Sequence, residues 1–181
     1  MTTPRLTPLD PPYPPEVDSL LESLRMGLPE PLGLFRTLAR SPRVLGRVKA
    51  GGLLDRGPVP LRLREIVILR TTARCGAEYE WGVHVAGFAQ KAGFSDADVQ
   101  ATATLGAHAH TWSESEALAV ELVDALHDTS HVDDVLYGKL AMAFTPEVLI
   151  ELIALVGFYH LVSFEVNALR IARERFAPAL R

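Results

Sequence analysis

Glu80 and His84 are the residues whose types and spacing most directly suggest chemistry in this chain. They stand four positions apart in EYEWGVH, residues 78–84. On a helix, two residues at that spacing lie on one face within contact distance. A carboxylate that hydrogen-bonds an imidazole raises its basicity and selects its tautomer, which suits a group that transfers protons near neutral pH. The pair is therefore a candidate for acid–base catalysis.

Three neighbours are expected to complete such a site. Glu65 lies in the preceding predicted helix and reaches the same face if the two helices pack antiparallel across residues 75–76. Tyr79 and Trp81 flank the pair and would provide apolar walls. The alternative is a solvent-exposed Glu–His pair that stabilises its helix by roughly 0.3 kcal/mol, with Glu65 in a surface ion pair with nearby arginines.

The remaining histidines and the cysteine give weaker signals. His108 and His110 form an H-x-H in a predicted loop and are expected at the surface, because no third ligand lies nearby. His127 and His131 are four residues apart, but the predicted break in DTSH argues against a shared metal site. One cysteine makes neither an intrachain disulfide nor a zinc-type cysteine cluster, and phosphate-loop and dinucleotide motifs are absent from the sequence. We expect no cofactor and no metal.

Helices are the elements that must position these residues. Apolar residues recur at helical spacing, and strand-like alternation joined by hairpin turns is scarce. Ser113 and Glu116 have the spacing of a capping box, and Ser130 is expected to cap the helix after it. The predicted helices span residues 16–28, 31–39, 61–74, 77–93, 117–128, 131–144 and 146–176, with further helix starts at Pro42 and after Ser95. The predicted fold class is all-α.

The first 15 residues differ from the rest of the chain. They contain six prolines, which remove amide donors and fix φ, so residues 1–15 are predicted to form an extended proline-rich arm. Residues 16–181 are expected to form a single helical domain, because the chain is of a size typical for one domain.

Composition restricts the class of partner. The net charge is −4 without a basic block, which argues against nucleic acid. The longest apolar segment contains Glu151 and His160, so we expect no membrane-spanning helix. The N-terminus is unlike a signal peptide, and the expected location is cytoplasmic. Hydrophobic residues make up 48% of the chain, which favours a homo-oligomer that covers part of them.

A resemblance to a known family strengthens the interpretation of the Glu–His pair. The segment LRLREIVILRTTARCGAEYEWGVHVAGFAQKAGFSDADV, residues 61–99, resembles the core of the carboxymuconolactone decarboxylase and alkylhydroperoxidase D (AhpD-like) superfamily. In the peroxidase branch of that superfamily, a glutamate is followed by Cys-x-x-Cys and then by a histidine. Counted from Glu65, the thiol positions are Ala77 and Glu80, and the histidine is His84. The chain is thus similar to a branch that lacks the Cys-x-x-Cys pair.

The resemblance implies an AhpD-like helical bundle, a homo-oligomer and a small-molecule substrate. By analogy with the decarboxylase branch, His84 would donate or accept a proton, Glu80 would orient it, and Glu65 would be a relay or second orienter. Arg70 and Arg74 are candidate anchors for a substrate carboxylate only by proximity.

His160 is either a core histidine or a second wall of the His84 pocket, and the resemblance favours the wall. The leading hypothesis is an enzyme acting on a small carboxylated organic acid or lactone. The alternatives are a peroxidase-related protein, which would need a thiol partner for Cys75, and a non-catalytic oligomeric binder of small molecules. Cys75 itself is expected to be buried and inert.

Overall fold

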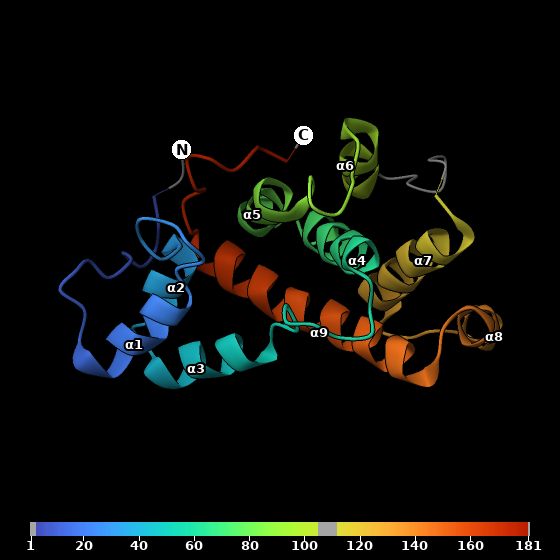
Figure 1. Ribbon diagram of the computed structural model, residues 1–181, viewed down its shortest axis with the longest axis horizontal. Coiled ribbons are helices and arrows are strands. Elements are labelled where there is room, and N and C mark those ends of the chain that lie inside the picture. Colours follow the sequence, from blue (N-terminus) through green and yellow to red (C-terminus); the bar gives the residue numbers. More distant parts are fainter. Residues whose placement is uncertain (1–2, 105–111, 181) are drawn as a thin grey trace.

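All regular secondary structure is helical in the part of the chain that the computed structural model describes, residues 3–104 and 112–180, and no strand occurs within it (Figure 1). The helices are α1 (Pro15–Ser23), α2 (Gly33–Leu38), α3 (Pro42–Gly51), α4 (Leu61–Arg74), α5 (Glu78–Phe88), α6 (Asp96–Ala103), α7 (Glu114–Thr129), α8 (Asp134–Ala143) and α9 (Pro146–Leu169). The predicted all-α fold class is confirmed.

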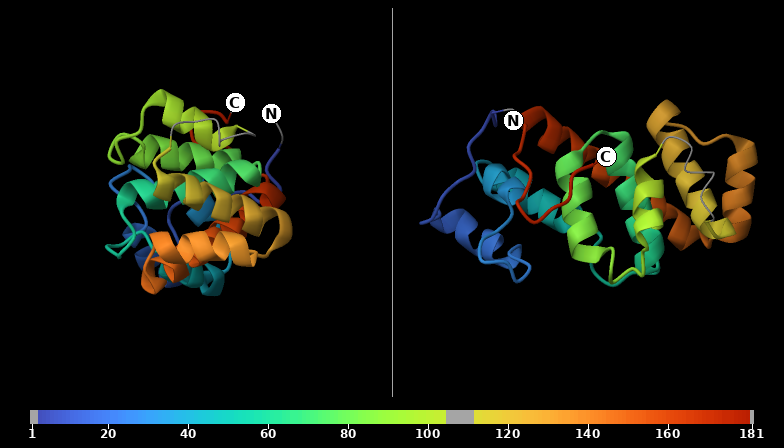
Figure 2. Two further views of the ribbon diagram at one scale, coloured as in Figure 1. Left: turned by 90° about the vertical axis from the view of Figure 1, so that its right-hand side faces the viewer. Right: turned by 90° about the horizontal axis from the view of Figure 1, so that it is seen from above.

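Helix α9 runs through the middle of the molecule and joins its two larger hydrophobic clusters. Figure 2 shows α1 to α3 at one end and α7 with α8 at the other, with α4 and α5 between them. The C-terminal half of α9 packs on the first cluster through Val162 and Val166, and the N-terminal half packs on the second through Leu152 and Leu155. Phe158 contacts both clusters.

Helix α4 is the most enclosed element and brings polar residues into the core. It packs against α5, α6, α7 and α9. Ten of its residues are buried, among them Arg64, Glu65 and Arg70. Buried charged groups are costly without partners, so the packing around α4 must supply partners for these three side chains.

Local signals in the sequence set most helix starts correctly. Ser95 and Asp98 form a capping box at α6, and Ser113 and Glu116 form one at α7. Thr145 caps α9 through the Val148 amide. These caps satisfy amide donors that the first helical turn leaves unpaired.

Four predicted boundaries were wrong. Helix α1 ends at Ser23, whereas the first helix was predicted to continue to residue 28. Helix α5 ends at Phe88, and the chain then turns up to Gly93, which has φ +71°. Asp133 caps α8, whereas Ser130 ends α7 in a left-handed conformation with φ 56°. Helix α9 stops at Leu169 because Arg170 adopts φ 53°, so the last predicted helix was too long.

The turn between α4 and α5 determines how the candidate residues meet. Gly76 lies in this turn with φ +61°, a conformation that favours glycine. The turn lets α5 fold back along α4, as the sequence predicted, and the two helices are in contact. A second glycine, Gly82, admits the C-terminal segment, because a Cβ there would lie 2.5 Å from the Pro178 carbonyl oxygen.

The N-terminal arm is extended and lies against two helices. The Arg5 amide donates to the Leu169 carbonyl at 2.9 Å, and the Leu9 amide donates to the Arg36 carbonyl at 3.1 Å. Arg36 Nε in turn donates to the Leu9 carbonyl at 2.8 Å. The proline-rich residues are therefore attached to α2 and to the end of α9.

One expectation about the apolar segment was wrong. Although the segment contains Glu151 and His160, it satisfies the length and composition of a membrane span, and α9 is, as predicted, one continuous helix, of 24 residues. Among the described residues, α9 is the helix long and apolar enough to cross a membrane, with a mean hydropathy of 1.8 over a window that is 39% buried. A helix in the core of a folded domain can have the same length and hydropathy. Helix α9 lies in the core here, because the two larger hydrophobic clusters pack on it.

Candidate active site

His84 lies at the centre of a buried cluster built from three helices. Glu65 comes from α4, Glu80 and His84 come from α5, and Tyr159 comes from α9. All four side chains are buried, and Glu65 is completely inaccessible to solvent. The exposed Glu–His pair, the alternative left open by the sequence, is thereby excluded.

The imidazole of His84 is held between two carboxylates. Its Nδ1–H donates to Glu65 Oε2 at 2.8 Å, and its Nε2 lies 3.4 Å from Glu80 Oε1. Glu65 is thus the closer orienter, whereas the sequence placed Glu80 first. The reason is that Glu65 approaches from the facing helix, while Glu80 reaches along the same helix from the preceding turn.

Arg64 balances the charge of the cluster. Its Nε donates to Glu65 Oε1 at 3.1 Å, and its Nη1 donates to the Leu54 carbonyl at 3.0 Å. The guanidinium carbon lies 5.6 Å from the centre of the Phe88 ring. Two carboxylates, one guanidinium and one imidazolium therefore lie together with no net charge, which makes their burial tolerable.

Aromatic rings enclose His84 on two sides. Phe88 stacks on it with ring centres 5.2 Å apart, and Tyr159 meets it edge-on at 5.1 Å. These rings exclude water and lower the local dielectric constant, which strengthens the interactions with the carboxylates.

The cluster alters the pKa of His84. Burial alone would lower the pKa of its imidazolium, but the charges and hydrogen bonds of Glu65 and then Glu80 outweigh burial and raise the pKa to about 9. His84 therefore holds its proton at neutral pH. In this state it is a proton donor with both ring nitrogens directed at carboxylates.

A cavity of about 430 Å³ opens beside the cluster. Glu80 and Tyr159 line it, together with apolar residues of α2, α3 and α9 and the segment after α3. Within the described part of the chain, Glu80 Oε2 is buried and has no hydrogen-bond partner. Because such an atom is costly to leave unpaired, it is the atom of the cluster best placed to bind a ligand.

Tyr159 and Lys49 add further polar groups to this cavity. Burial, followed by the charges of Glu80 and Glu65, raises the pKa of the Tyr159 phenol well above its ordinary value, so its hydroxyl stays protonated. Lys49 is exposed and is the positively charged residue among the described residues lining the cavity. Asp55 also lines the cavity, so the lining combines two carboxylates, a phenol and an ammonium group.

A third carboxyl group, that of Glu165, lies near the cluster. Burial, followed by the charge of Glu80, raises the pKa of the Glu165 carboxyl to about 7. Its Oε2 is buried and, within the described residues, has no hydrogen-bond partner. Glu165 therefore titrates close to neutral pH and is sensitive to the charge of Glu80.

Two expected walls of the pocket lie elsewhere. The Tyr79 hydroxyl donates to Glu174 at 2.7 Å and accepts from the Leu34 amide at 3.0 Å, so Tyr79 joins α5 to α2 and to the C-terminal segment. Trp81 Nε1 donates to Thr102 Oγ1 at 3.2 Å and packs towards α6. The rings that touch His84 belong instead to Phe88 and Tyr159.

Arg70 and His160 were also misplaced by sequence reasoning. Arg70 is almost fully buried and forms a bidentate pair with Asp124, with both N–O distances 2.8 Å. It also donates to the Thr104 carbonyl at 2.7 Å, so it joins α4, α7 and the end of α6 and does not line the cavity. His160 faces His127, with 3.1 Å between their nitrogens, and does not form a wall of the His84 pocket.

Sequence reasoning missed Arg64, Tyr159 and Glu165. Tyr159 offered a signal, because it falls on the same helical face as Val156 and Ser163, both of which are buried.

Cys75 is half-buried, less than expected, and burial raises the pKa of its thiol. His108 and His110 lie outside the described residues.

Comparisons with known proteins match a family and a fold. Residues 42–125 match the family model described as "Carboxymuconolactone decarboxylase family". This range contains Glu65, Glu80 and His84, and it ends before α8 and α9. No significant match was found among curated protein sequences.

Solved structures share the fold across almost the whole chain. An uncharacterized peroxidase-related protein from Silicibacter sp. TM1040 has a TM-score of 0.81 at 15% identity, with 100% of both chains covered. An alkylhydroperoxidase AhpD core protein from Ralstonia eutropha JMP134 has a TM-score of 0.78 at 16% identity, covering 96% of this chain and 95% of that chain. The debrominase Bmp8 in complex with 2,3,4-tribromopyrrole has a TM-score of 0.77 at 18% identity, covering 97% and 94%. At these identities the likeness concerns the fold alone.

Proposed function

We propose that this chain is a decarboxylase-like enzyme, because residues 42–125 match the carboxymuconolactone decarboxylase family model and include Glu65, Glu80 and His84. Its substrate is a small carboxylated organic acid or lactone, bound in the cavity beside Glu80. Glu80 and His84 carry out the proton transfer, and Glu65 positions His84.

One observation carries this proposal. Glu80 belongs both to the cavity lining and to the His84 cluster, and its Oε2 has no hydrogen-bond partner among the described residues. A ligand in the cavity is thus in reach of a carboxylate whose other oxygen lies 3.4 Å from a protonated imidazole. This is the arrangement that general acid–base catalysis requires.

The chemistry follows from these contacts. The bond between the substrate carbon and its carboxylate breaks, CO₂ leaves, and the electron pair is delocalised into the lactone. A proton then passes from His84 Nε2 through Glu80 to the carbon, which forms the new C–H bond. Solvent returns one proton to His84, so each cycle consumes one proton. Glu65 keeps the ring oriented throughout, because its bond to Nδ1 is unaffected by the transfer at Nε2.

Substrate binding is assigned to Lys49 and Tyr159. The Lys49 ammonium at the cavity lining supplies the positive charge that a substrate carboxylate needs. The protonated Tyr159 hydroxyl is a donor for a lactone oxygen. Apart from Glu80 and Asp55, the remaining lining residues are apolar or glycine, which suits a small organic ring.

A peroxidase-related activity is the second candidate, suggested by the peroxidase-related proteins that share the fold. Two observations argue against it. Ala77 and Glu80 stand where the superfamily's thiols would be, and burial raises the pKa of Cys75, which lowers its thiolate fraction. A non-catalytic small-molecule binder would use the same cavity without the proton transfer.

The test is CO₂ release with carboxymuconolactone as the probe, followed by a panel of other lactone carboxylic acids. We expect Lys49→Met to raise KM about tenfold with little change in kcat, because a single exposed charge contact is lost. Lys139→Met, the same change at an exposed site outside the cavity, is the matched control. The proposal is contradicted if none of these acids is decarboxylated, or if reduction of hydrogen peroxide depends on Cys75.

We also propose that the chain assembles with copies of itself. Large apolar side chains of α8 and α9 are exposed, among them Met142 at 92%, Val135 at 73% and Ile150 at 69%. Exposed large apolar side chains are typical of subunit interfaces. Ile150→Glu should shift the mass measured by light scattering towards the monomer, whereas binding of the unmodified chain to lipid vesicles would favour a membrane at this face.

A further inference from the structure

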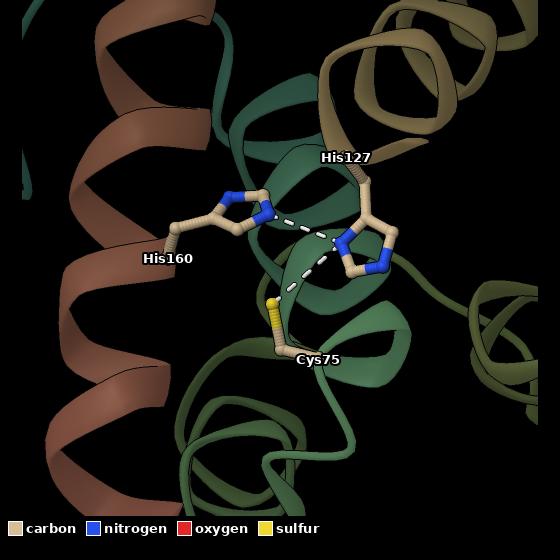
Figure 3. Close-up of side chains that lie close together, drawn as sticks. All are labelled: Cys75, His127 and His160. Carbon is tan, nitrogen blue, oxygen red and sulfur yellow. Dashed lines mark hydrogen bonds between the residues drawn. The ribbon is translucent and has the colours of Figure 1, made fainter. Parts of the chain in front are cut away.

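Cys75, His127 and His160 come together from three helices on a part of the molecule that the acid–base cluster does not use (Figure 3). Cys75 follows the last residue of α4, His127 lies in the last turn of α7, and His160 lies in α9. Figure 3 shows the sulfur and the two rings directed at one another. Within the described residues, their ligand atoms are the ones that lie close enough together to hold a metal ion, all within 4.8 Å of one another.

The spacing of the three ligand atoms suits one metal ion. His127 Nδ1 lies 3.1 Å from His160 Nε2 and 3.8 Å from Cys75 Sγ. A tetrahedral zinc ion with ordinary bond lengths places two nitrogens about 3.3 Å apart and a nitrogen and a sulfur about 3.6 Å apart. The third pair, Cys75 and His160, lies within 4.8 Å, so rotation of side chains completes the site without moving the helices.

The tautomer of His160 is set for coordination. Its Nδ1 lies 2.8 Å from the Val156 carbonyl oxygen, and since a carbonyl can only accept, Nδ1 carries the proton. The lone pair of the neutral ring is therefore on Nε2, the nitrogen that faces the other two residues. Metal-ligating histidines typically donate their second N–H to a backbone carbonyl in this way.

The surroundings permit an ion to enter. All three residues are half-buried, so the site is open to solvent on one side. The nearby cation Arg74 is paired, at 3.5 Å with Asp124 and more closely with Asp128. These two carboxylates offset its repulsion of a bound ion.

We propose that Cys75, His127 and His160 bind Zn²⁺, with water in the fourth position. One thiolate and two imidazoles are ligands that zinc prefers, and they disfavour magnesium and calcium, which take oxygen ligands. On binding, Cys75 releases its proton to solvent, and His127 moves its proton from Nδ1 to Nε2. The ion joins α4, α7 and α9 at one point and does not involve the decarboxylation.

The experiment uses the untagged full chain, stripped with a chelator and titrated with Zn²⁺ against a chromophoric competitor. We expect one ion per chain. Cys75→Ser, His127→Gln and His160→Gln should each weaken binding at least about 100-fold, because each removes one of only three protein ligands. His131→Gln, an exposed histidine close to His127 in the sequence, should bind as the unmodified chain does.

Co²⁺ provides a second readout that does not depend on variant stability. The unmodified chain with Co²⁺ should show a sulfur-to-metal charge-transfer band, since a thiolate is a ligand, and Cys75→Ser should lack it while its helical circular dichroism is unchanged. Binding of less than one Zn²⁺ per chain, equal affinity in Cys75→Ser, or a Co²⁺ spectrum without that band would each overturn the proposal.

Discussion

Helix α4 contributes to two clusters that contain histidine, one near each end, and they differ in what surrounds the ring. Near its start, Glu65 reaches the buried His84 at 2.8 Å. Just after its end, Cys75 Sγ lies 3.8 Å from the half-buried His127. Helix α9 completes both clusters with adjacent residues, Tyr159 for the first and His160 for the second.

The difference shows that the charged groups around a histidine determine whether its imidazole is protonated at neutral pH, and therefore whether it can donate a proton or bind a metal. Two carboxylates hold a proton on His84 and raise its pKa to about 9, so the ring is a proton donor at neutral pH. Among the described residues, no carboxylate is hydrogen-bonded to His127 in this way, and burial, followed by the charges of Arg74 and His160, lowers its pKa. A neutral ring presents a lone pair, which suits a metal ligand. We therefore expect different consequences when each cluster is changed.

The largest expected effect is on catalysis. Glu80→Gln should reduce kcat for CO₂ release about 10³-fold, because an amide cannot relay a proton between His84 and the substrate. Glu78→Gln, the same change at an exposed position of α5, should leave kcat unaltered. Equal activity of the Glu80 variant and the unmodified chain would show that the acid–base cluster is structural.

A smaller effect is expected on stability. Glu65→Gln should lower the free energy of unfolding by about 3 kcal/mol at pH 6, because it leaves the buried His84 cation with a weaker partner. His127→Gln, at a half-exposed position, should cost less than about 1 kcal/mol. Urea denaturation measures both, and similar costs for the two variants would remove the distinction between the clusters.

The pH dependence of the same pair follows from the sign of the shift. The pKa of His84 is raised from 6.5 to about 9, so its contribution to stability is complete below pH 6.5 and is lost as pH rises through 9. The difference between the unmodified chain and Glu65→Gln should therefore shrink between pH 6.5 and 9. A difference that grows over this range would contradict the assigned charges.

The smallest expected effect concerns Glu165. Its pKa is raised to about 7, so the folded chain binds an extra proton between about pH 4.5 and 7 and loses stability as pH rises through that range. Glu165→Gln should remove this loss and stabilise the chain at pH 8 by roughly 1 kcal/mol, a figure reduced for its partial exposure. The change in Tm between pH 5 and 8, relative to the unmodified chain, measures it. No relative change would show that Glu165 is not sensitive to burial or to Glu80.

The sequence predicted what depends on neighbours along the chain. The bounds of α4, the capping boxes at Ser95 and Ser113 and the closeness of Glu80 to His84 all follow from spacings of three or four residues or from local turn chemistry. The approach of Glu65 to His84 was predicted from the turn at Gly76, which lets α5 fold back along α4. These features are local, and they came out as expected.

Features that depend on distant partners could not be predicted in the same way. Tyr79 turns away from His84 because Glu174, 95 residues later, accepts its hydroxyl. Arg70 is occupied by Asp124, 54 residues away. The contact of Cys75 with His127 spans 52 residues, and that of His127 with His160 spans 33. No spacing rule links such positions, so the thiol–imidazole cluster emerged only from the packing of α4, α7 and α9.

The central claim is that two carboxylates keep His84 protonated at neutral pH beside the cavity. Titration of its ring resonances by nuclear magnetic resonance, assigned with His84→Gln, tests this most directly. The expected result is a pKa of about 9 that falls towards 6.5 in Glu65→Gln and Glu80→Gln. A His84 pKa below 7 in the unmodified chain, or one that neither substitution alters, would contradict the account.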